Sequence, residues 1–86
     1  MRIARTERFK KAWGQLSEEE KKLAREAVGL LALDMHHPDL RVKRMRGTDD
    51  IWEARVSLSL RLTFEVRADG IVLRVIGRHD EALRRP

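Results

Sequence analysis

Two arginines and a histidine in the second half of the chain have the side chains best suited to chemistry. Arg55 and Arg61 each lie in a segment where charged and apolar residues alternate, which is typical of a strand with its charged side chains on one face. The guanidinium of arginine is planar, permanently charged and able to bind two phosphate oxygens at once. His79 follows a third apolar segment, and histidine can donate a proton near neutral pH. These residues indicate phosphate binding and proton transfer.

Each of these residues also has a structural interpretation. Arg61 could form a salt bridge across a sheet with Glu53 or Glu65, and Arg55 could be an ordinary solvated residue. His79 could cap or hydrogen-bond a turn near the C-terminus. The elements that carry these residues therefore decide between the two interpretations.

The spacing of the apolar residues changes near Pro38 and predicts helices before it. Two helices are expected, within about residues 6–15 and 17–35. Ser17 and Glu20 form a capping box at the start of the second helix. Pro38 disfavours helical geometry in the residue before it, so the second helix should end there.

After Pro38 the pattern predicts strands. Apolar and polar residues alternate within residues 52–58, 60–66 and 71–76, and residues 68–70 have the composition of a turn. An edge strand at Ile3 and a further strand over residues 40–45 are also expected.

These elements predict one α+β domain over residues 1–86, with an N-terminal helical pair packed on one face of a small antiparallel β-sheet. The apolar side chains should face the helices. The opposite face is expected to be open and to carry the charged and polar side chains of Glu53, Arg55, Arg61, Thr63 and Glu65.

The composition restricts the partners and the compartment. The formal net charge is +5, and residues 41–86 hold eleven Lys and Arg against seven Asp and Glu, so a polyanion or an acidic protein is a suitable partner. The absence of cysteine excludes disulfides and thiolate metal sites. The sequence has neither a signal-peptide pattern nor an apolar run of membrane length, so we expect a cytoplasmic protein without a membrane partner.

Four short motifs follow one another in the second half of the chain. They are Arg46-Gly47, the strand from Ile51 to Val56, the strand from Leu60 to Val66, and Val75-Ile76-Gly77-Arg78-His79-Asp80. Their order and spacing resemble the RelE/ParE superfamily of bacterial toxins. In that family an aromatic residue opens a strand of alternating basic residues. A turn, an Arg-Leu-x-aromatic strand and a last strand ending in Gly-x-(Arg or His) follow. The helical pair also fits, so the resemblance covers nearly the whole chain.

The resemblance implies the toxin of a type II toxin–antitoxin system, with the RelE-like fold. RelE-like members are ribosome-dependent endoribonucleases, also called mRNA interferases. They enter the ribosomal A site, next to 16S rRNA, and cut the messenger RNA there, which blocks translation. The expected reaction is attack of a 2′-hydroxyl on the adjacent phosphate, and it requires no metal and no cofactor. A cognate antitoxin protein is the expected partner, with an acidic segment covering the basic surface and any open sheet edge.

The resemblance also implies roles for individual residues. Arg61 stands where the family has a strand arginine, and Arg55 stands where RelE-like members are usually basic, so both are expected to bind phosphate. His79 stands where members carry arginine or histidine at the end of the last strand, which implies a general acid. The basic residues expected to bind RNA are Lys43, Arg44, Arg46, Arg74 and Arg78.

Glu53 departs from the family pattern, because RelE-like members usually have lysine there. A glutamate serves as the base in YoeB-like members, but it precedes this strand, where Asp39 is a loose match. Two neighbouring arginines would keep Glu53 ionised and make it a poor base. A structural partnership of Glu53 with Arg55 or Arg61 is therefore favoured, and the identity of the base stays open.

Two other functions stay open. The ParE branch shares the fold and poisons DNA gyrase without nuclease chemistry, and an inert homologue would only bind its antitoxin. His79 together with two aligned arginines favours the nuclease. His36 and His37 are interpreted as residues of a helix end and not as metal ligands, because neighbouring residues point in different directions and no cysteine or paired carboxylate completes a site.

Overall fold

The N-terminal part of the chain forms a short strand and the two expected helices. The structure is a computed structural model that describes residues 2–48 and 50–86. The elements in this part are β1 (Arg2–Arg5), α1 (Glu7–Gly14) and α2 (Glu18–Leu33). Ser17 accepts a hydrogen bond from the Glu20 backbone, and the Glu20 carboxylate accepts one from the Ser17 backbone, so the capping box at the start of α2 is confirmed.

The rest of the chain forms a short helical turn, four strands and a third helix. These elements are η1 (Pro38–Leu40), β2 (Lys43–Arg44), β3 (Ile51–Arg55), β4 (Leu60–Arg67), β5 (Gly70–Arg78) and α3 (His79–Arg84). The three alternating strands are confirmed, and the strand expected over residues 40–45 is reduced to the two residues of β2. The structure also contains α3, where only a C-terminal turn was expected.

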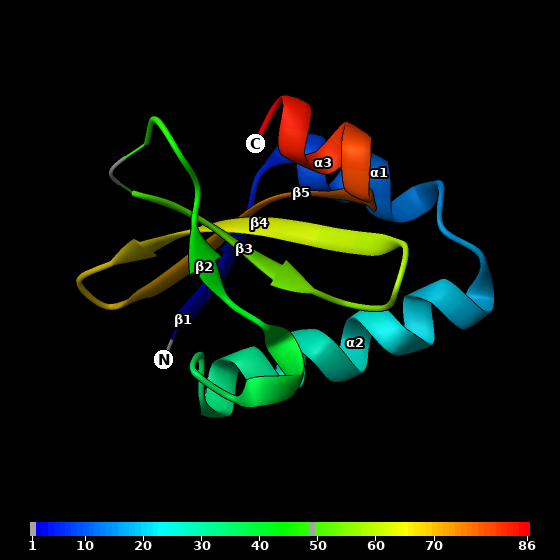
Figure 1. The fold of residues 1–86 in the computed structure, drawn as a ribbon. Helices are drawn as coiled ribbons and strands as arrows, with labels where there is room; N and C mark the ends of the chain where they lie inside the picture. The colour runs from blue at the N-terminus through cyan, green and yellow to red at the C-terminus, as the bar shows by residue number, and fades with distance from the viewer. Residues whose placement is uncertain (1, 49) are drawn as a thin grey trace.

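The sheet has the strand order β1-β5-β4-β3-β2 and is mixed, which corrects the expectation of an antiparallel sheet. β1 runs parallel to β5, whereas the other neighbours are antiparallel. The close approach of β1 depends on Gly70, because a Cβ at that position would overlap the carbonyl of Arg2. Figure 1 shows β1 at the far edge, behind β5.

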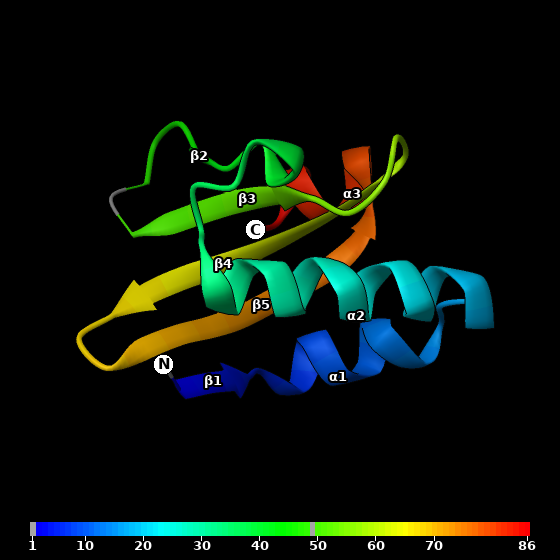
Figure 2. The same ribbon diagram turned by 90° about the horizontal axis from the view of Figure 1, so that it is seen from below.

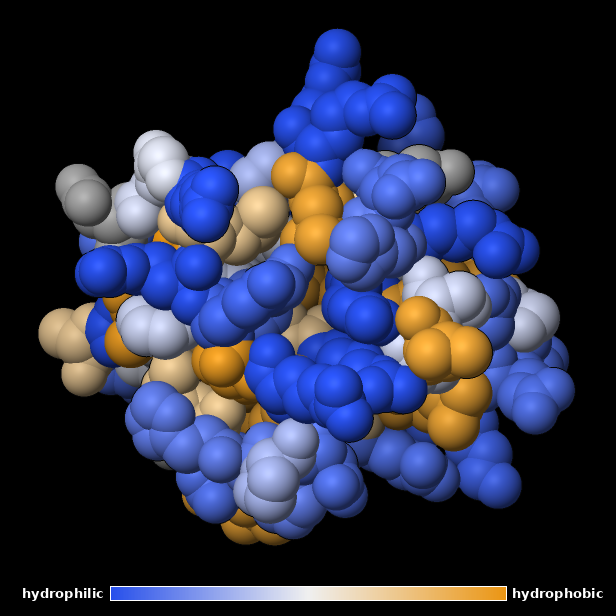
Figure 3. All heavy atoms as spheres, viewed as in Figure 1, coloured by the Kyte–Doolittle hydropathy of each residue, from blue (hydrophilic) through white to orange (hydrophobic). Residues whose placement is uncertain are grey.

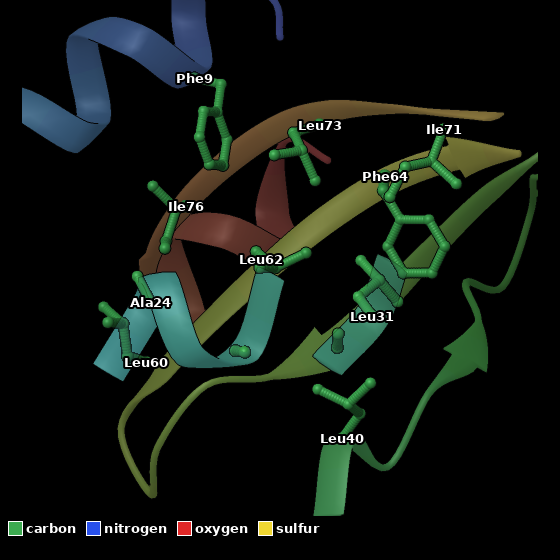
Figure 4. Packing of buried hydrophobic residues seen from close by; sticks show 12 residues of the cluster. Phe9, Ala24, Leu31, Leu40, Leu60, Leu62, Phe64, Ile71, Leu73 and Ile76 are labelled. Atoms are coloured by element: carbon green, nitrogen blue, oxygen red, sulfur yellow. The ribbon is translucent and has the colours of Figure 1, made fainter. Parts of the chain in front are cut away.

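The hydrophobic core lies between the sheet and the first two helices. α2 crosses one face of the sheet, and α1 continues in the direction of β1 along β5 (Figure 2). Leu31 of α2 and Leu62 and Phe64 of β4 are fully buried, and Phe9 brings α1 into the same cluster (Figure 4). The helical pair packed on the sheet is therefore confirmed.

α3 lies on the opposite face of the sheet from α2, as Figure 1 shows, with the sheet between them. Ala82 of α3 is fully buried, and so is Thr63 of β4 beneath it. The expectation that this face is open is therefore wrong at its centre. The reason is local, because β5 ends at Arg78 and His79 starts a helix that folds back over β4 and β5. No helix in the described part of the chain is long and apolar enough to cross a membrane.

Candidate functional site

A hydrogen-bonded network closes the centre of one sheet face. This face, called here the outward face, carries Glu53, Arg55, Arg61, Thr63 and Glu65. Thr63 Oγ1 donates to the backbone oxygen of Pro86 at 3.0 Å, and Arg74 Nε donates to the same oxygen at 2.8 Å. Arg74 also forms an ion pair with Glu65, which in turn pairs with Arg67. The segment that follows α3 is thus bound to the middle of the outward face.

A β-bulge directs Arg74 into this network. Thr63 pairs with Val75, but the next residue, Phe64, pairs with Leu73, so Arg74 is the extra residue of β5. Arg74 was predicted to bind RNA. It is half-buried and bound to the carboxylate of Glu65 and to the backbone oxygen of Pro86, so the structure gives it a role in holding the C-terminal segment.

Glu53 lies next to the network on β3 and is almost fully buried. Its carboxylate lies 3.3 Å from Nζ of Lys43, the residue opposite it on β2. The expected partnership with Arg55 or Arg61 is therefore wrong, since a lysine of the next strand supplies the cation. The Lys43 side chain is 73% exposed, so Glu53 orients an amine that remains accessible to a ligand.

Arg55 and Arg61 lie directly opposite each other at one end of the outward face. Arg55 pairs with Arg61 between β3 and β4, and Arg61 pairs with Gly77 between β4 and β5. Because neighbouring strands are about 4.8 Å apart, this row spans roughly 10 Å across three strands. The structure therefore brings together the two arginines predicted to bind phosphate.

The guanidinium of Arg61 binds the turn between β3 and β4. Its Nη1 donates to the carbonyls of Ser57, Leu58 and Leu60 at 2.5, 3.2 and 3.2 Å. These acceptors are neutral, and the salt bridge that was considered with Glu53 or Glu65 does not form. The positive charge of Arg61 is thus held in a fixed position beside Arg55 without a carboxylate partner among the side chains that the structure describes.

His79 begins α3 at the same end of the sheet. Its backbone N–H donates to the carbonyl of Ser59 at 3.0 Å, next to the turn that Arg61 binds. Its imidazole is exposed, with Nδ1 3.5 Å from a carboxylate oxygen of Asp80. The imidazole thus lies at the surface and not in the core.

The other predicted residues lie outside this cluster. Arg44 and Arg46 are exposed in and after β2. Arg78 pairs with Leu60 and so points to the α2 side of the sheet. The pKa of Glu20 there is lowered mainly by the hydrogen bond from the Ser17 backbone, and the charge of Arg78 adds to this effect. Asp39 lies in η1 beside His37, with its carboxylate 3.9 Å from Nδ1.

In Figure 3, which has the β2 edge of the sheet toward the viewer, the visible surface is mostly hydrophilic, and apolar residues reach it only in small separate areas. Among the side chains that the structure describes, no three His, Cys, Asp or Glu residues gather closely enough to hold a metal ion. The cluster therefore offers cationic and hydrogen-bonding groups to an anion.

Comparison with solved structures assigns the fold. The chain is similar to YafQ in the Escherichia coli DinJ–YafQ toxin–antitoxin complex (TM-score 0.79, 12% identity, 93% of each chain covered). It is similar to the YoeB dimer of Staphylococcus aureus (TM-score 0.77, 12% identity, 92% of this chain and 97% of that chain). It is also similar to the RelE–RelB complex of Pyrococcus horikoshii (TM-score 0.74, 19% identity, 94% and 97%).

The chain has the RelE-like toxin fold. This confirms the fold that the sequence motifs indicated. No family model and no curated protein matches the sequence.

Sequence reasoning missed several residues of this RelE-like domain that border the site. Thr63 was recognised only as an outward-facing polar residue, and nothing near it in sequence indicates its contact with Pro86, 23 residues later. Arg8 and Lys11 of α1 line a groove of about 520 Å³ together with Gly77 and Arg78. Residues three apart on a helix lie on the same face, so their spacing could have indicated a basic face of α1.

Proposed function

We propose that this chain is the toxin of a type II toxin–antitoxin pair in the RelE/ParE superfamily, and that it is a ribosome-dependent endoribonuclease. The RelE-like fold, the net charge of +5 and the cationic end of the outward face support this proposal. Its substrate is messenger RNA in the ribosomal A site, 16S rRNA is a further contact, and it acts in the cytoplasm.

The observation that carries the proposal is the pairing of Arg55 with Arg61. Like charges directly opposite each other on neighbouring strands destabilise a sheet. Among the described residues, the contacts of Arg61 are with neutral carbonyls through Nη1, so the pair keeps its positive charge there. A phosphate group between the two guanidiniums offsets the repulsion, because each guanidinium can bind an anion through two N–H groups.

In the proposed reaction the 2′-oxygen attacks the adjacent phosphorus, and its proton passes to solvent water. The bond from phosphorus to the 5′-oxygen of the next nucleotide then breaks. Arg55 and Arg61 stabilise the negative charge that develops on the phosphate oxygens. His79 gives its proton to the departing 5′-oxygen. The products are a 2′,3′-cyclic phosphate and a free 5′-hydroxyl.

Glu53 is assigned a structural role in this proposal. It is almost fully buried, and its carboxylate is occupied by Lys43. Lys43 and the exposed Arg44 and Arg46 then bind the RNA backbone beside the reacting phosphate. Asp39 lies in η1, where its backbone N–H donates to Nδ1 of His37 at 3.1 Å, outside the row that contains Arg55 and Arg61.

A cleavage assay with purified ribosomes tests the proposal. A programmed ribosome complex is incubated with the wild-type chain, Arg61→Ala or Arg61→Lys, and cuts are mapped by primer extension. We expect the wild-type chain to cut in the A-site codon only when ribosomes are present. Arg61→Ala should lower the cleavage rate by roughly 10²–10³-fold. Arg61→Lys should restore little of this rate, because lysine lacks the planar guanidinium.

A gyrase supercoiling assay with the same preparations separates the other functions. Inhibited supercoiling without RNA cleavage would show a ParE-like gyrase poison. A folded chain that is inactive in both assays and still binds an antitoxin would show an inert homologue. Either result contradicts the nuclease proposal.

A further inference from the structure

A cavity with aromatic and basic walls lies between the first two helices. It has a volume of about 360 Å³ and is lined by residues of β1, α1, α2 and β5. Phe9 and Trp13 of α1 form its aromatic wall, with their ring centres 6.1 Å apart. Pockets for small ligands typically have roughly 300–1,000 Å³, so this cavity has room for one small molecule.

Trp13 is the aromatic ring that a ligand can reach. Phe9 is almost fully buried in the core, whereas Trp13 is only half-buried. The guanidinium of Arg25 lies over the Trp13 ring, 6.0 Å from its centre. An aromatic ring and a guanidinium are both flat groups on which a nucleobase can stack. This wall therefore suits a flat, aromatic ligand.

The cavity also has three exposed cations, which are Arg5, Lys10 and Arg25. None of the described residues that line it is acidic. Lys10 is paired with Glu7 at 3.4 Å, but no salt bridge joins Arg5 or Arg25 to a carboxylate among the side chains that the structure describes. The two guanidiniums are thus available to an anion, and each can bind it through two N–H groups.

We propose that this cavity binds a purine nucleoside monophosphate. The purine stacks at Trp13, and its two fused rings offer a larger stacking area than a pyrimidine. The phosphate group carries about two negative charges near neutral pH and is bound by Arg5 and Arg25. A bare phosphate would leave the ring without a contact, and a neutral aromatic molecule would leave the arginines without an anion.

The cavity is separate from the cationic end of the outward face. Leu73 of β5 forms its sheet side and belongs to the core under the helices. Arg61 lies on the outward face and pairs with Gly77, farther along β5. A bound nucleotide therefore leaves Arg55 and Arg61 free, and the inference does not rest on the nuclease proposal.

Titration with adenosine monophosphate, followed by NMR, tests the inference. The chain has two tryptophans, so the indole N–H of Trp13 reports on the cavity and that of Trp52 in β3 is an internal control. Trp52→Phe assigns the two resonances. We expect the Trp13 resonance to shift with a dissociation constant below about 1 mM, and the Trp52 resonance to stay in place.

Ligands that carry one half of the nucleotide separate the two contacts. Adenosine lacks the phosphate, and ribose 5-phosphate lacks the base. Each should bind at least ten-fold more weakly than adenosine monophosphate, because each loses either the ion pairs or the stacking. Inorganic phosphate at an equal concentration should not displace the nucleotide.

Substitutions of the cavity residues test the same contacts from the side of the protein. Arg5→Gln combined with Arg25→Gln should weaken nucleotide binding at least ten-fold. Arg46→Gln combined with Arg84→Gln is the matched control, because it makes the same change in net charge at exposed residues outside the cavity. Thermal unfolding checks that both variants fold.

Trp13→Leu removes the flat ring and should weaken binding by a similar factor, measured by calorimetry. Trp13 packs partly against the core, so this variant also loses stability. The arginine variants change exposed side chains and therefore test the cavity even where Trp13→Leu does not fold.

An unshifted Trp13 resonance at millimolar nucleotide, or equal shifts of both tryptophans, would overturn the inference. Adenosine or inorganic phosphate that binds as tightly as the nucleotide would also overturn it, since the cavity would then be a general aromatic or anion site. A short oligoadenylate that shifts Trp13 at a lower concentration than the mononucleotide would assign the cavity to an RNA-binding surface instead. The assay needs neither ribosomes nor RNA cleavage, so its failure leaves the nuclease proposal intact.

Discussion

Arg55 and Arg61 face each other directly across β3 and β4, and Arg61 is fixed there by three backbone carbonyls of the adjoining turn. Two opposed positive charges cost stability in the absence of an anion, by roughly 0.2–1 kcal/mol in comparable sheets.

We therefore expect Arg55→Gln to raise the free energy of unfolding at low salt by about 0.5 kcal/mol. The same change should reduce the stabilisation that added phosphate gives the wild-type chain, because one of the two guanidiniums is lost. Urea unfolding with and without phosphate measures both effects. Arg67→Gln is the matched control, since Arg67 has Glu65 as a partner and its loss should not stabilise the fold. A destabilised Arg55→Gln would show that Arg55 has a structural role.

His79→Ala should lower ribosome-dependent cleavage by roughly 10²–10⁴-fold if His79 protonates the leaving oxygen. Its side chain is exposed, so the unfolding temperature should hardly change. The loss should be much smaller with a 5′-phosphorothiolate substrate, whose leaving group needs no proton. His36→Ala, at another exposed histidine, serves as the control. An equal loss on both substrates would assign His79 to binding and not to proton transfer.

Glu53→Gln should retain most of the cleavage rate. The amide has the same shape as the carboxylate, so a structural residue tolerates the change, whereas a general base would lose roughly 10²–10⁴-fold. Lys43→Gln is the companion variant, because it removes the cation of the same pair and leaves the buried carboxylate. We expect weaker binding to ribosomes from Lys43→Gln. Single-turnover cleavage rates of Glu53→Gln that fall by two orders of magnitude would instead identify Glu53 as the base.

Thr63→Val should loosen the C-terminal segment. The side chain is fully buried, and valine has the same shape but cannot donate to the backbone oxygen of Pro86. Loss of one such hydrogen bond costs about 1 kcal/mol, and Arg74 still donates to that oxygen. Faster amide exchange in α3, with unchanged exchange in α2, is the expected result. Thr63→Ser keeps the hydroxyl, so the amides of α3 should exchange more slowly in this variant than in Thr63→Val.

The stability of the fold should depend on Glu20 at acidic pH. The backbone hydrogen bond from Ser17 is the main cause of the lowered pKa of Glu20, and Arg78 adds to it. A carboxyl group with a lowered pKa in the folded state stabilises the fold above its unfolded-state pKa and loses this contribution as the pH falls through its folded-state value. Glu20→Gln keeps a capping hydrogen bond and removes the titration. Its unfolding free energy should therefore fall less between pH 5 and pH 3 than that of the wild type. Parallel curves for the two proteins would show that this coupling is absent.

The parts of the fold with local signals were predictable from the sequence. The capping box of Ser17 and Glu20 indicated α2, and the alternation within residues 60–66 indicated β4. The parallel pairing of β1 was not predictable, because it joins four residues to a strand far along the chain. α3 has six residues and no side-chain cap, so it gave no helix signal.

The parts of the candidate site with local signals were also predictable from the sequence. Alternation correctly placed Arg55 and Arg61 on one face of the sheet. The bulge that turns Arg74 toward Pro86 adds one residue to β5, and no Gly or Pro stands next to Arg74 to mark it. The pairing of Glu53 with Lys43 depends on β2, whose two residues are too few to show a pattern. Long-range contacts thus decided the parts that the sequence left open.

The contact between β1 and β5 also determines when this chain can fold during its own synthesis. Thr6 hydrogen-bonds to Arg74, 68 residues later, so the first strand has no neighbour in the sheet until β5 has been made. At about 5–20 residues per second, that wait lasts several seconds. The contacts that complete the sheet are non-local, which also slows folding after release. A protein proposed to attack ribosomes therefore lacks its finished sheet until the ribosome has made residues 70–78.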